Sequence, residues 1–399
     1  MIYHIFTILP SFVILFWLIV FLVDGKTYNL HKRFLIAFLG VAFVNYVIHW
    51  FYFNHYYEVY RTLEFVWVFT SLSVFPLYYY YIRLLTVDKS INFKWIWILL
   101  PAILLSVFTF TLYRLMNPDE VEAFIHEILY RNKISVGENT HLINLQILRI
   151  NLFKIIFGIQ VFLTLFFGLR LINSFNKRVY AFYSNVENRE LNKIKTILIF
   201  FVLASIISSI SNLLGKDYFT DHPYLLYLIS LAHSIVLFGI SDVGYKQSFS
   251  IRELIKEPSI VELDENTDET VKDNMVGLEY DRLFLRIKDL FDTTKIYKDP
   301  ELKMIDVALR LGTNRTYISR LIHNRTSLNF SDFVNEYRVK NAEELLSSTK
   351  EPFLSLEEIA FESGFTGSSS FYRAFKKKNG IPPGRYRKIR ITHINSDDE

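Results

Sequence analysis

The chain has 399 residues, 51% of them apolar, with 37 phenylalanines and 25 tyrosines. This composition is unusual for a soluble protein, and the length is sufficient for two or three domains. The net charge of +4 averages two different parts, because long apolar segments fill the chain up to about residue 240 and an ordinary charged sequence follows. The absence of cysteine excludes disulfide bonds, thiolate metal sites and cysteine nucleophiles.

Seven segments are long and apolar enough to cross a membrane as helices. Crossing takes roughly 20 mostly apolar residues, because each residue rises about 1.5 Å and the hydrocarbon core is about 30 Å thick. The first segment is read as a span rather than a cleaved signal peptide, because no Lys or Arg precedes it and no small-residue cleavage motif follows it. The third contains Pro76 and the last is the shortest, so six spans is the alternative count. We place the segments at 2–23, 34–53, 63–84, 95–115, 150–172, 194–214 and 224–240.

Basic residues alternate between the loops that connect these segments, and positively charged loops tend to stay in the cytoplasm. The loops after the second, fourth and sixth segments are poorer in Lys and Arg, and the long one at 116–149 holds five acidic residues. We therefore expect a protein of the bacterial inner membrane, in contact with the lipid bilayer, with its N-terminus outside and residues after 240 in the cytoplasm. The basic loops after the first, third and fifth segments hold Lys26, Lys32 and Arg33; Lys89 and Lys94; and Arg170, Lys177, Arg178, Arg189 and Lys193.

Four ionisable residues lie within or near the apolar segments, where burial of charge is costly and a functional role is the default hypothesis. His49, Glu64, Lys154 and His233 are the candidates for a ligand pocket. The alternative for Glu64 and Lys154 is that they reach the lipid headgroups, since both lie close to a segment end. The external loop, which has helical character at 118–130, either caps such a pocket or is an inert connection.

The charged part of the chain divides into an acidic and a basic region. Residues 253–273 hold eight acidic residues against Lys256 and Lys272, whereas residues 279–391 hold 21 Lys and Arg against 15 Asp and Glu. The acidic region is typical of a solvated linker, and the basic one favours a polyanionic partner. We assign 1–244 to a seven-helix transmembrane domain, 245–277 to an acidic cytoplasmic linker, 278–391 to a basic domain and 392–399 to a disordered tail.

The basic domain repeats a pattern on itself. Val-Ala followed by glycine at 307–312 recurs as Ile-Ala followed by glycine at 359–364, and the helix around Arg320 recurs around Arg373. A glycine just past a helix can adopt the positive φ that its C-terminal cap commonly requires. Each copy therefore predicts a helix, a glycine turn and a second helix.

Local signals place the ends and faces of these helices. Asn314 is an expected N-cap, and Ser355 with Glu358 forms an expected capping box. An amphipathic helix at 330–346 would hold the two copies at a fixed separation, as two recognition helices about one DNA turn, roughly 34 Å, apart require. The side chains expected to point inward are Ile318, Leu321 and Ile322 in the first copy and Phe371, Ala374 and Phe375 in the second.

Residues 278–390 resemble the AraC/XylS-type DNA-binding domain, most strongly at 356–360, 370–376 and 380–387. Gly367 stands where that family often has a serine N-cap, and Ile322-His323 where Phe-Lys is more usual. The run Lys376-Lys377-Lys378, at the end of the second recognition helix, is either a solvated face or, as we expect, a set of phosphate contacts. Phosphate contacts position the domain, while base contacts specify the site. The resemblance implies that double-stranded DNA is the partner, and that the residues facing its major groove are Arg315, Thr316, Ser319, Arg320, Ser368, Ser369, Tyr372 and Arg373.

The sequence thus predicts an all-α protein that acts as a membrane-bound, sequence-specific transcriptional regulator. An unidentified small-molecule or envelope signal would act on the membrane domain, and a homodimer would present two DNA-binding domains to adjacent sites. The alternative is a membrane receptor or transporter whose C-terminal domain serves protein contacts. An enzyme is the weakest hypothesis, because no Walker loop, His-Glu-x-x-His pair or kinase or cyclase signature appears. We expect no catalytic residue, cofactor or metal site.

Overall fold

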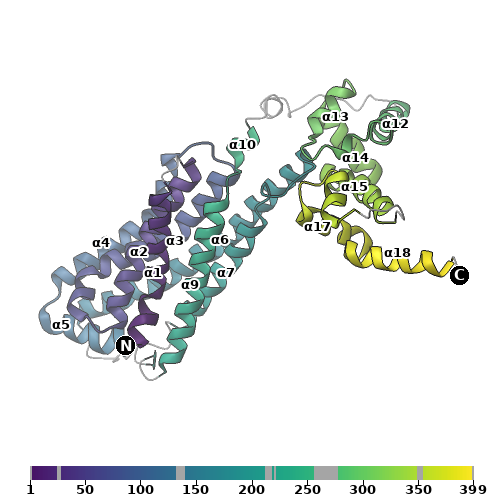
Figure 1. The fold of residues 1–399 in the computed structure, drawn as a ribbon. Coiled ribbons are helices and arrows are strands. Elements are labelled where there is room, and N and C mark those ends of the chain that lie inside the picture. The colour runs from purple at the N-terminus through teal and green to yellow at the C-terminus, as the bar shows by residue number, and fades with distance from the viewer. Residues whose placement is uncertain are drawn as a thin grey trace. The chain divides into compact units, whose positions relative to one another are not determined.

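The computed structural model describes residues 2–24, 28–131, 140–211, 218–219, 222–255, 277–347 and 354–397, and its regular elements are helices. The chain divides into two compact units. The first comprises residues 1–173 and 191–252, and the second comprises residues 174–190 and 253–399 (Figure 1).

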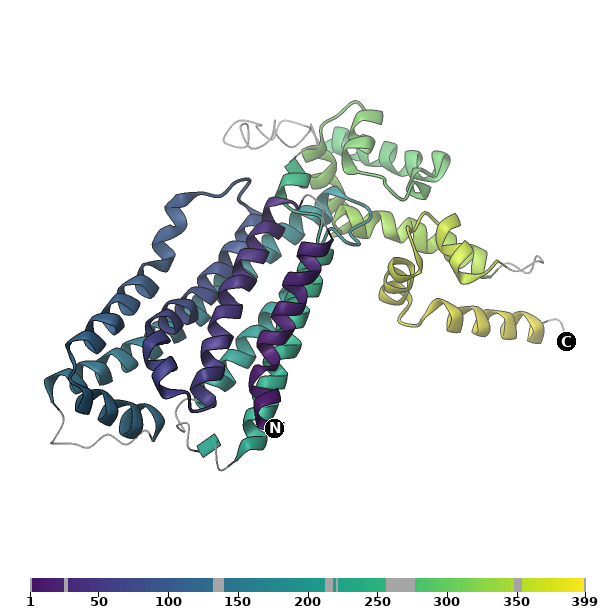
Figure 2. The ribbon, with the colours of Figure 1, turned by 60° about the vertical axis from the view of Figure 1, so that its left-hand side comes forward.

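Seven helices of the first unit are long and apolar enough to cross a membrane, which confirms the predicted number by length and composition. α1 packs against α2 and α9, α2 against α3, and α3 against α4, while α7 packs against α9 (Figure 2). Large apolar side chains such as Phe12, Phe162 and Ile235 are exposed on the outside of the bundle, a surface suited to lipid rather than water. The helices are α1 (Ile2–Val23), α2 (Leu30–Phe53), α3 (Tyr57–Thr86), α4 (Leu100–Leu115) preceded by the 3-10 helix η1 (Phe93–Leu99), α6 (His141–Phe182), α7 (Asn192–Ser211) and α9 (Pro223–Lys246).

The predicted helical character of the loop at 118–130 is confirmed. It forms α5 (Pro118–Ala123), which begins with a capping box between Asn117 and Glu120, and the π-helical turn η2 (Phe124–Tyr130). The Tyr130 hydroxyl donates to the carbonyl of Tyr52 at 3.1 Å, and the Tyr52 hydroxyl donates to the carbonyl of Leu129 at 3.2 Å. These bonds hold the loop against the end of α2.

The second unit is a series of short helices around two apolar cores. Phe330, Phe333 and Val334 of α15 belong to the first core, with residues of α12, α13 and α14, whereas Val339 and Ala342 belong to the second, with residues of α16 and α17. Because one helix contributes to both cores, the two halves are joined by a rigid element. The helices are α12 (Gly277–Thr294), η3 (Ile296–Lys298), α13 (Met304–Arg310), α14 (Arg315–Thr326), α15 (Phe330–Leu346), α16 (Leu356–Glu362), α17 (Ser368–Asn379) and α18 (Pro383–Asp397).

The structure differs from the sequence expectation at the C-terminal tail and extends it at the linker. Residues 392–397, expected to be disordered, continue α18, because neither glycine nor proline occurs after Gly384 to end the helix. The expected linker begins inside α9, which ends at Lys246, and contains the short helix α10 (Ile251–Ile255). Most of the acidic stretch, residues 256–276, lies outside the described residues, as do 398–399.

Candidate nucleic-acid interface

The first candidate recognition helix is α14. Its N-cap is confirmed, since the side chain of Asn314 accepts a hydrogen bond from the Tyr317 amide at 3.0 Å. The residues predicted to point inward, Ile318, Leu321 and Ile322, are all buried. The opposite face of α14 carries the predicted DNA-facing residues, of which Arg320 is exposed and Arg315, Thr316 and Ser319 are partly exposed.

The second candidate recognition helix is α17, which buries Phe371 and Phe375, leaves Ala374 partly buried and exposes the side opposite. Gly367 precedes it with extended backbone and no side-chain cap, as expected from the missing serine. Five predicted DNA-contacting residues are all exposed on this helix: Ser368, Ser369, Tyr372, Arg373 and Lys376.

The two glycine turns have the same backbone conformation but different surroundings. Gly312 has φ +64° and Gly364 has φ +88°, a region that side-chain-bearing residues rarely adopt. A Cβ atom at Gly312 would meet no atom within 4 Å, whereas at Gly364 it would lie 2.5 Å from the carbonyl oxygen of Tyr297. The second turn therefore needs glycine for its φ and for the close approach of η3.

The three lysines at the end of α17 are not equivalent. Lys377 pairs with Asp332 at 2.7 Å and Lys378 with Glu343 at 3.3 Å, and both acidic partners belong to α15. Lys376 is exposed and has no hydrogen bond or ion pair with another described residue. Of the three lysines, Lys376 is therefore the one whose charge is not paired within the described residues.

Residues 174–190, which we call the 174–190 segment, make contacts that no sequence pattern predicts. This segment comprises the end of α6 and the loop after it, and it belongs to the second unit. Glu190 accepts a hydrogen bond from Nη1 of Arg373 at 2.9 Å. The guanidinium of Arg315 lies 3.7 Å from the ring centroid of Phe182, and burial lowers the pKa of Arg315 to about 10. Two predicted DNA-facing arginines, one on each recognition helix, thus contact this segment.

Arg338 of α15 holds the same segment from within the core. It is almost fully buried, and its Nε donates to the carbonyl of Tyr297 at 2.8 Å. Its Nη2 donates to the carbonyl of Asp299 at 2.7 Å and to the Ser184 hydroxyl at 3.1 Å. The Ser331 hydroxyl also donates to the carbonyl of Ser184, at 3.0 Å. Burial lowers the pKa of Arg338 to about 10, so the side chain keeps its charge at neutral pH.

The first unit contains a cavity of about 360 Å³ that is lined by three of the four candidate pocket residues, His49, Lys154 and His233. Glu64 does not line it. Instead, Glu64 lies 2.7 Å from the Arg149 guanidinium, in a buried ion pair, and accepts a hydrogen bond from the Tyr113 hydroxyl. Sequence spacing does not reveal Arg149 as the partner of Glu64, because the two residues lie 85 positions apart along the chain.

Residues 307–389 match the family model described as a helix-turn-helix domain. Over 89 residues the chain is 34% identical to the uncharacterized HTH-type transcriptional regulator YtdP of Bacillus subtilis, covering 22% of this chain and 11% of that protein. It is 32% identical over 87 residues to the Msm operon regulatory protein of Streptococcus mutans, covering 22% and 30%. It is 30% identical over 128 residues to the Transposon Tn10 TetD protein of Escherichia coli, covering 31% of this chain and 91% of that protein.

This chain therefore spans about a tenth of the first relative and less than a third of the second, but nearly all of the third. The matched residues include both glycine turns and both candidate recognition helices. The chain belongs to the AraC family of helix-turn-helix DNA-binding transcriptional regulators.

Proposed function

We propose that the protein is a membrane-bound transcriptional regulator whose first unit receives a signal and whose second unit reads DNA. The first unit would lie in the bacterial inner membrane with the N-terminus outside. Seven apolar helices and the alternation of basic loops support this orientation, because an odd number of spans delivers the second unit to the cytoplasm, where DNA is.

The observation that carries the proposal is the division of α6 between the two units. Its residues up to 173 belong to the first unit, and from 174 onward they belong to the second. The same segment supplies Phe182 and Glu190, which contact Arg315 and Arg373. A polypeptide that leaves the apolar bundle therefore contacts the residues proposed to bind DNA.

Through these contacts, a signal received by the first unit would change the surroundings of the residues proposed to bind DNA. Glu190 and DNA compete for the guanidinium of Arg373, because both are anionic partners of one cation. A ligand shifts such an equilibrium to the extent that it binds one state better than the other. A signal that moves the 174–190 segment away from α17 would release Arg373 for DNA.

The nine DNA-facing residues divide by chemistry. Arg315, Arg320 and Arg373 can each donate two parallel hydrogen bonds to a guanine edge, the commonest base-specific contact of arginine. Lys376 is assigned to phosphate. A homodimer would place two such domains on adjacent sites, and confinement of both copies in one bilayer raises their effective concentration.

Chromatin precipitation of the full-length protein tests the proposal. Arg373→Ala should reduce occupancy of the operator about 5- to 150-fold, the value of one bidentate arginine contact, while membrane insertion is unchanged. Lys340→Ala, at an exposed position of α15 and outside both recognition helices in sequence, is the control and should retain occupancy. Equal occupancy by wild type and Arg373→Ala would exclude base reading by this residue.

A further inference from the structure

The cavity in the first unit lies toward one end of the bundle. Its lining comes from the start of α1, the first part of α9, the second half of α2 and α7, the middle of α3 and the early part of α6. Most of these parts lie in the half of the bundle that holds the N-terminus (Figure 1). In the orientation proposed above, this end faces outward, so the cavity is placed to receive a molecule from outside the cell.

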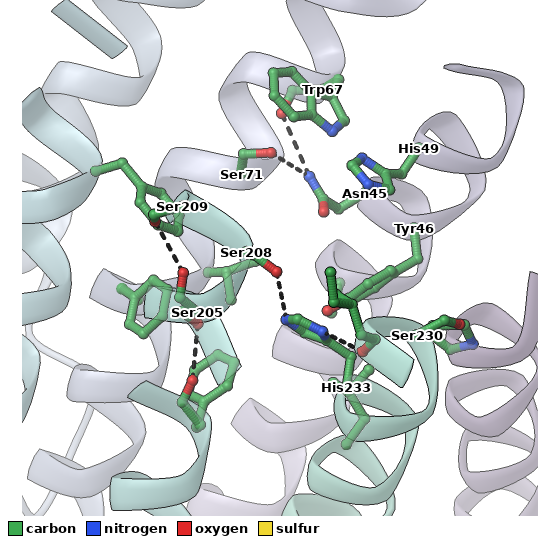
Figure 3. Close-up of a pocket in the computed structure, with 18 of the residues that line it drawn as sticks. Asn45, Tyr46, His49, Trp67, Ser71, Ser205, Ser208, Ser209, Ser230 and His233 are labelled. Carbon is green, nitrogen blue, oxygen red and sulfur yellow. Dashed lines mark hydrogen bonds between the residues drawn. The ribbon is translucent and has the colours of Figure 1, made fainter. Parts of the chain in front are cut away.

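Several polar groups of the cavity are already satisfied within the protein (Figure 3). Asn45 donates to the Ser71 hydroxyl at 2.6 Å, and Ser205 and Ser209 donate to carbonyls of their own helix. Nδ1 of His233 lies 2.9 Å from the carbonyl of Ile229, so this nitrogen carries the proton. Nε2 of the same ring then accepts from the Ser208 hydroxyl at 3.3 Å, which makes His233 a neutral imidazole with both nitrogens used.

Other lining groups are donors without an acceptor. Nε1 of Trp67 is buried and has no hydrogen-bond partner within the described residues. Lys154, His49 and Tyr46 line the same cavity, and no hydrogen bond or ion pair joins any of them to another described residue. Lys154 alone presents three donors and a positive charge. Trp67 and Lys154 can only donate, so an acceptor is what these two groups lack.

Among its lining residues that the structure describes, the cavity also has a basic side chain, Lys154, without an acidic one. Neither aspartate nor glutamate occurs among the described residues that line it, and the carboxylate of Glu64 is paired with Arg149. A charge that is removed from water is costly unless it is paired. Lys154 is partly exposed and has no such partner among the described residues; an anion with acceptor atoms would supply one.

The remaining lining is apolar and largely aromatic, with Phe75, Phe153, Phe157 and Phe201 among it. The rings of Trp67 and Phe153 are stacked at 5.1 Å, and those of Phe75 and Phe201 at 4.6 Å. A volume of about 360 Å³ falls in the range of small-ligand pockets, roughly 300–1,000 Å³.

We propose that this cavity binds a small amphipathic organic carboxylate. The carboxylate pairs with Lys154 and accepts from the unpartnered donors, and the apolar body lies among the phenylalanines. The proposal that such a carboxylate is the signal of the regulator rests on the function proposed above. Its binding to the cavity does not require DNA.

The test uses the full-length protein in nanodiscs of uncharged phosphatidylcholine, titrated by calorimetry with three probes. These are 4-phenylbutyrate, its neutral counterpart 4-phenylbutanamide, and decanoate. The phenyl acid should bind at least about tenfold more tightly than the amide, as expected for a charge-assisted bond. Binding of 4-phenylbutyrate but not decanoate would assign the site to compact aromatic acids. Binding of decanoate but not 4-phenylbutyrate would assign it to acids of lipid origin.

Three variants make the test specific. Lys154→Met should remove the preference for acid over amide, Lys154→Arg should keep it, and Lys193→Met, an exposed lysine outside the cavity, should also keep it. Equal affinity of acid and amide in the wild type, absence of binding by both acids, or an unchanged preference in Lys154→Met would overturn the proposal. If acids fail to bind while Arg373→Ala still abolishes operator occupancy, the ligand assignment falls and the regulatory function stands.

Discussion

At the scale of single residues, the contact between Arg373 and Glu190 involves an arginine that we propose to face DNA. The side chain of Arg373 is 55% exposed and that of Glu190 is 12% exposed. An ion pair with one partner in solvent contributes little, typically 0.2–1 kcal/mol. Such a contact is strong enough to bias the arginine and weak enough for DNA to displace it.

Replacing Glu190 by Gln should therefore raise DNA affinity. Loss of the carboxylate charge removes the competitor of DNA for Arg373, and the expected gain is about two- to fivefold. Fluorescence anisotropy of labelled operator DNA with the full-length protein measures it. Glu362→Gln is the matched control, because Glu362 pairs with Lys298 of η3, outside both the 174–190 segment and the recognition helices. An unchanged affinity in Glu190→Gln, or the same gain in the control, would contradict competition at Arg373.

The two glycine turns offer a second comparison at this scale. Gly312→Ala should cost about 1–2 kcal/mol, because a side-chain-bearing residue must adopt positive φ there but meets no neighbour. Gly364→Ala should cost more, since its Cβ would also collide with the backbone of Tyr297 and Lys298. Hydrogen–deuterium exchange of peptides from α13 and α16 in the full-length protein compares the two losses of protection. A larger loss in Gly312→Ala would show that the close approach to η3 is relaxed in solution.

At the scale of elements, α15 has two roles, and only the first can be predicted from its sequence. Its apolar periodicity predicts a helix that joins two cores, and the structure confirms that both cores draw on it. Its buried Arg338 has a different role, because this side chain bonds to η3, to Asp299 and to Ser184. Burial of an arginine with three acceptors fixes the 174–190 segment against α15.

Arg338→Met should loosen that segment while the helices of the second unit persist. Two backbone carbonyls and one hydroxyl lose their donor, and an unsatisfied buried group costs about 1–3 kcal/mol. Faster hydrogen–deuterium exchange is expected at residues 183–190, compared with Lys340→Met as a surface control. Exchange that rises uniformly over α12–α17 would instead indicate that Arg338 supports the whole unit.

The features predicted from the sequence depend on residues close together along the chain, whereas the features that were missed depend on residues far apart. The N-cap at Asn314, the capping box at Ser355 and the buried faces of α14 and α17 depend on residues within one or two helical turns, so spacing reveals them. The bond between Arg338 and Ser184 joins residues 154 apart, a separation at which spacing carries no information. Hydropathy located the apolar part of α6 at 150–172 but not its end at Phe182, because polar residues without glycine or proline continue a helix beyond the apolar stretch.

At the scale of the whole molecule, the chain joins an apolar seven-helix unit to an AraC-type DNA-binding unit, and the second unit is discontinuous in sequence. Residues 191–252, with the apolar helices α7 and α9, separate its two parts. In the proposed orientation, membrane insertion and DNA binding are thus properties of one interleaved chain rather than of two domains in series.

This interleaving has a consequence for biosynthesis. When the ribosome has completed the 174–190 segment, the residues that it contacts in the second unit have not yet been made. Arg338 and Arg373 emerge only after α7 and α9 have been synthesised and, in the proposed topology, inserted into the bilayer. Ser184 and Glu190 therefore acquire Arg338 and Arg373 as partners only after α7 and α9 have been made, so these contacts form last in the synthesis of the chain.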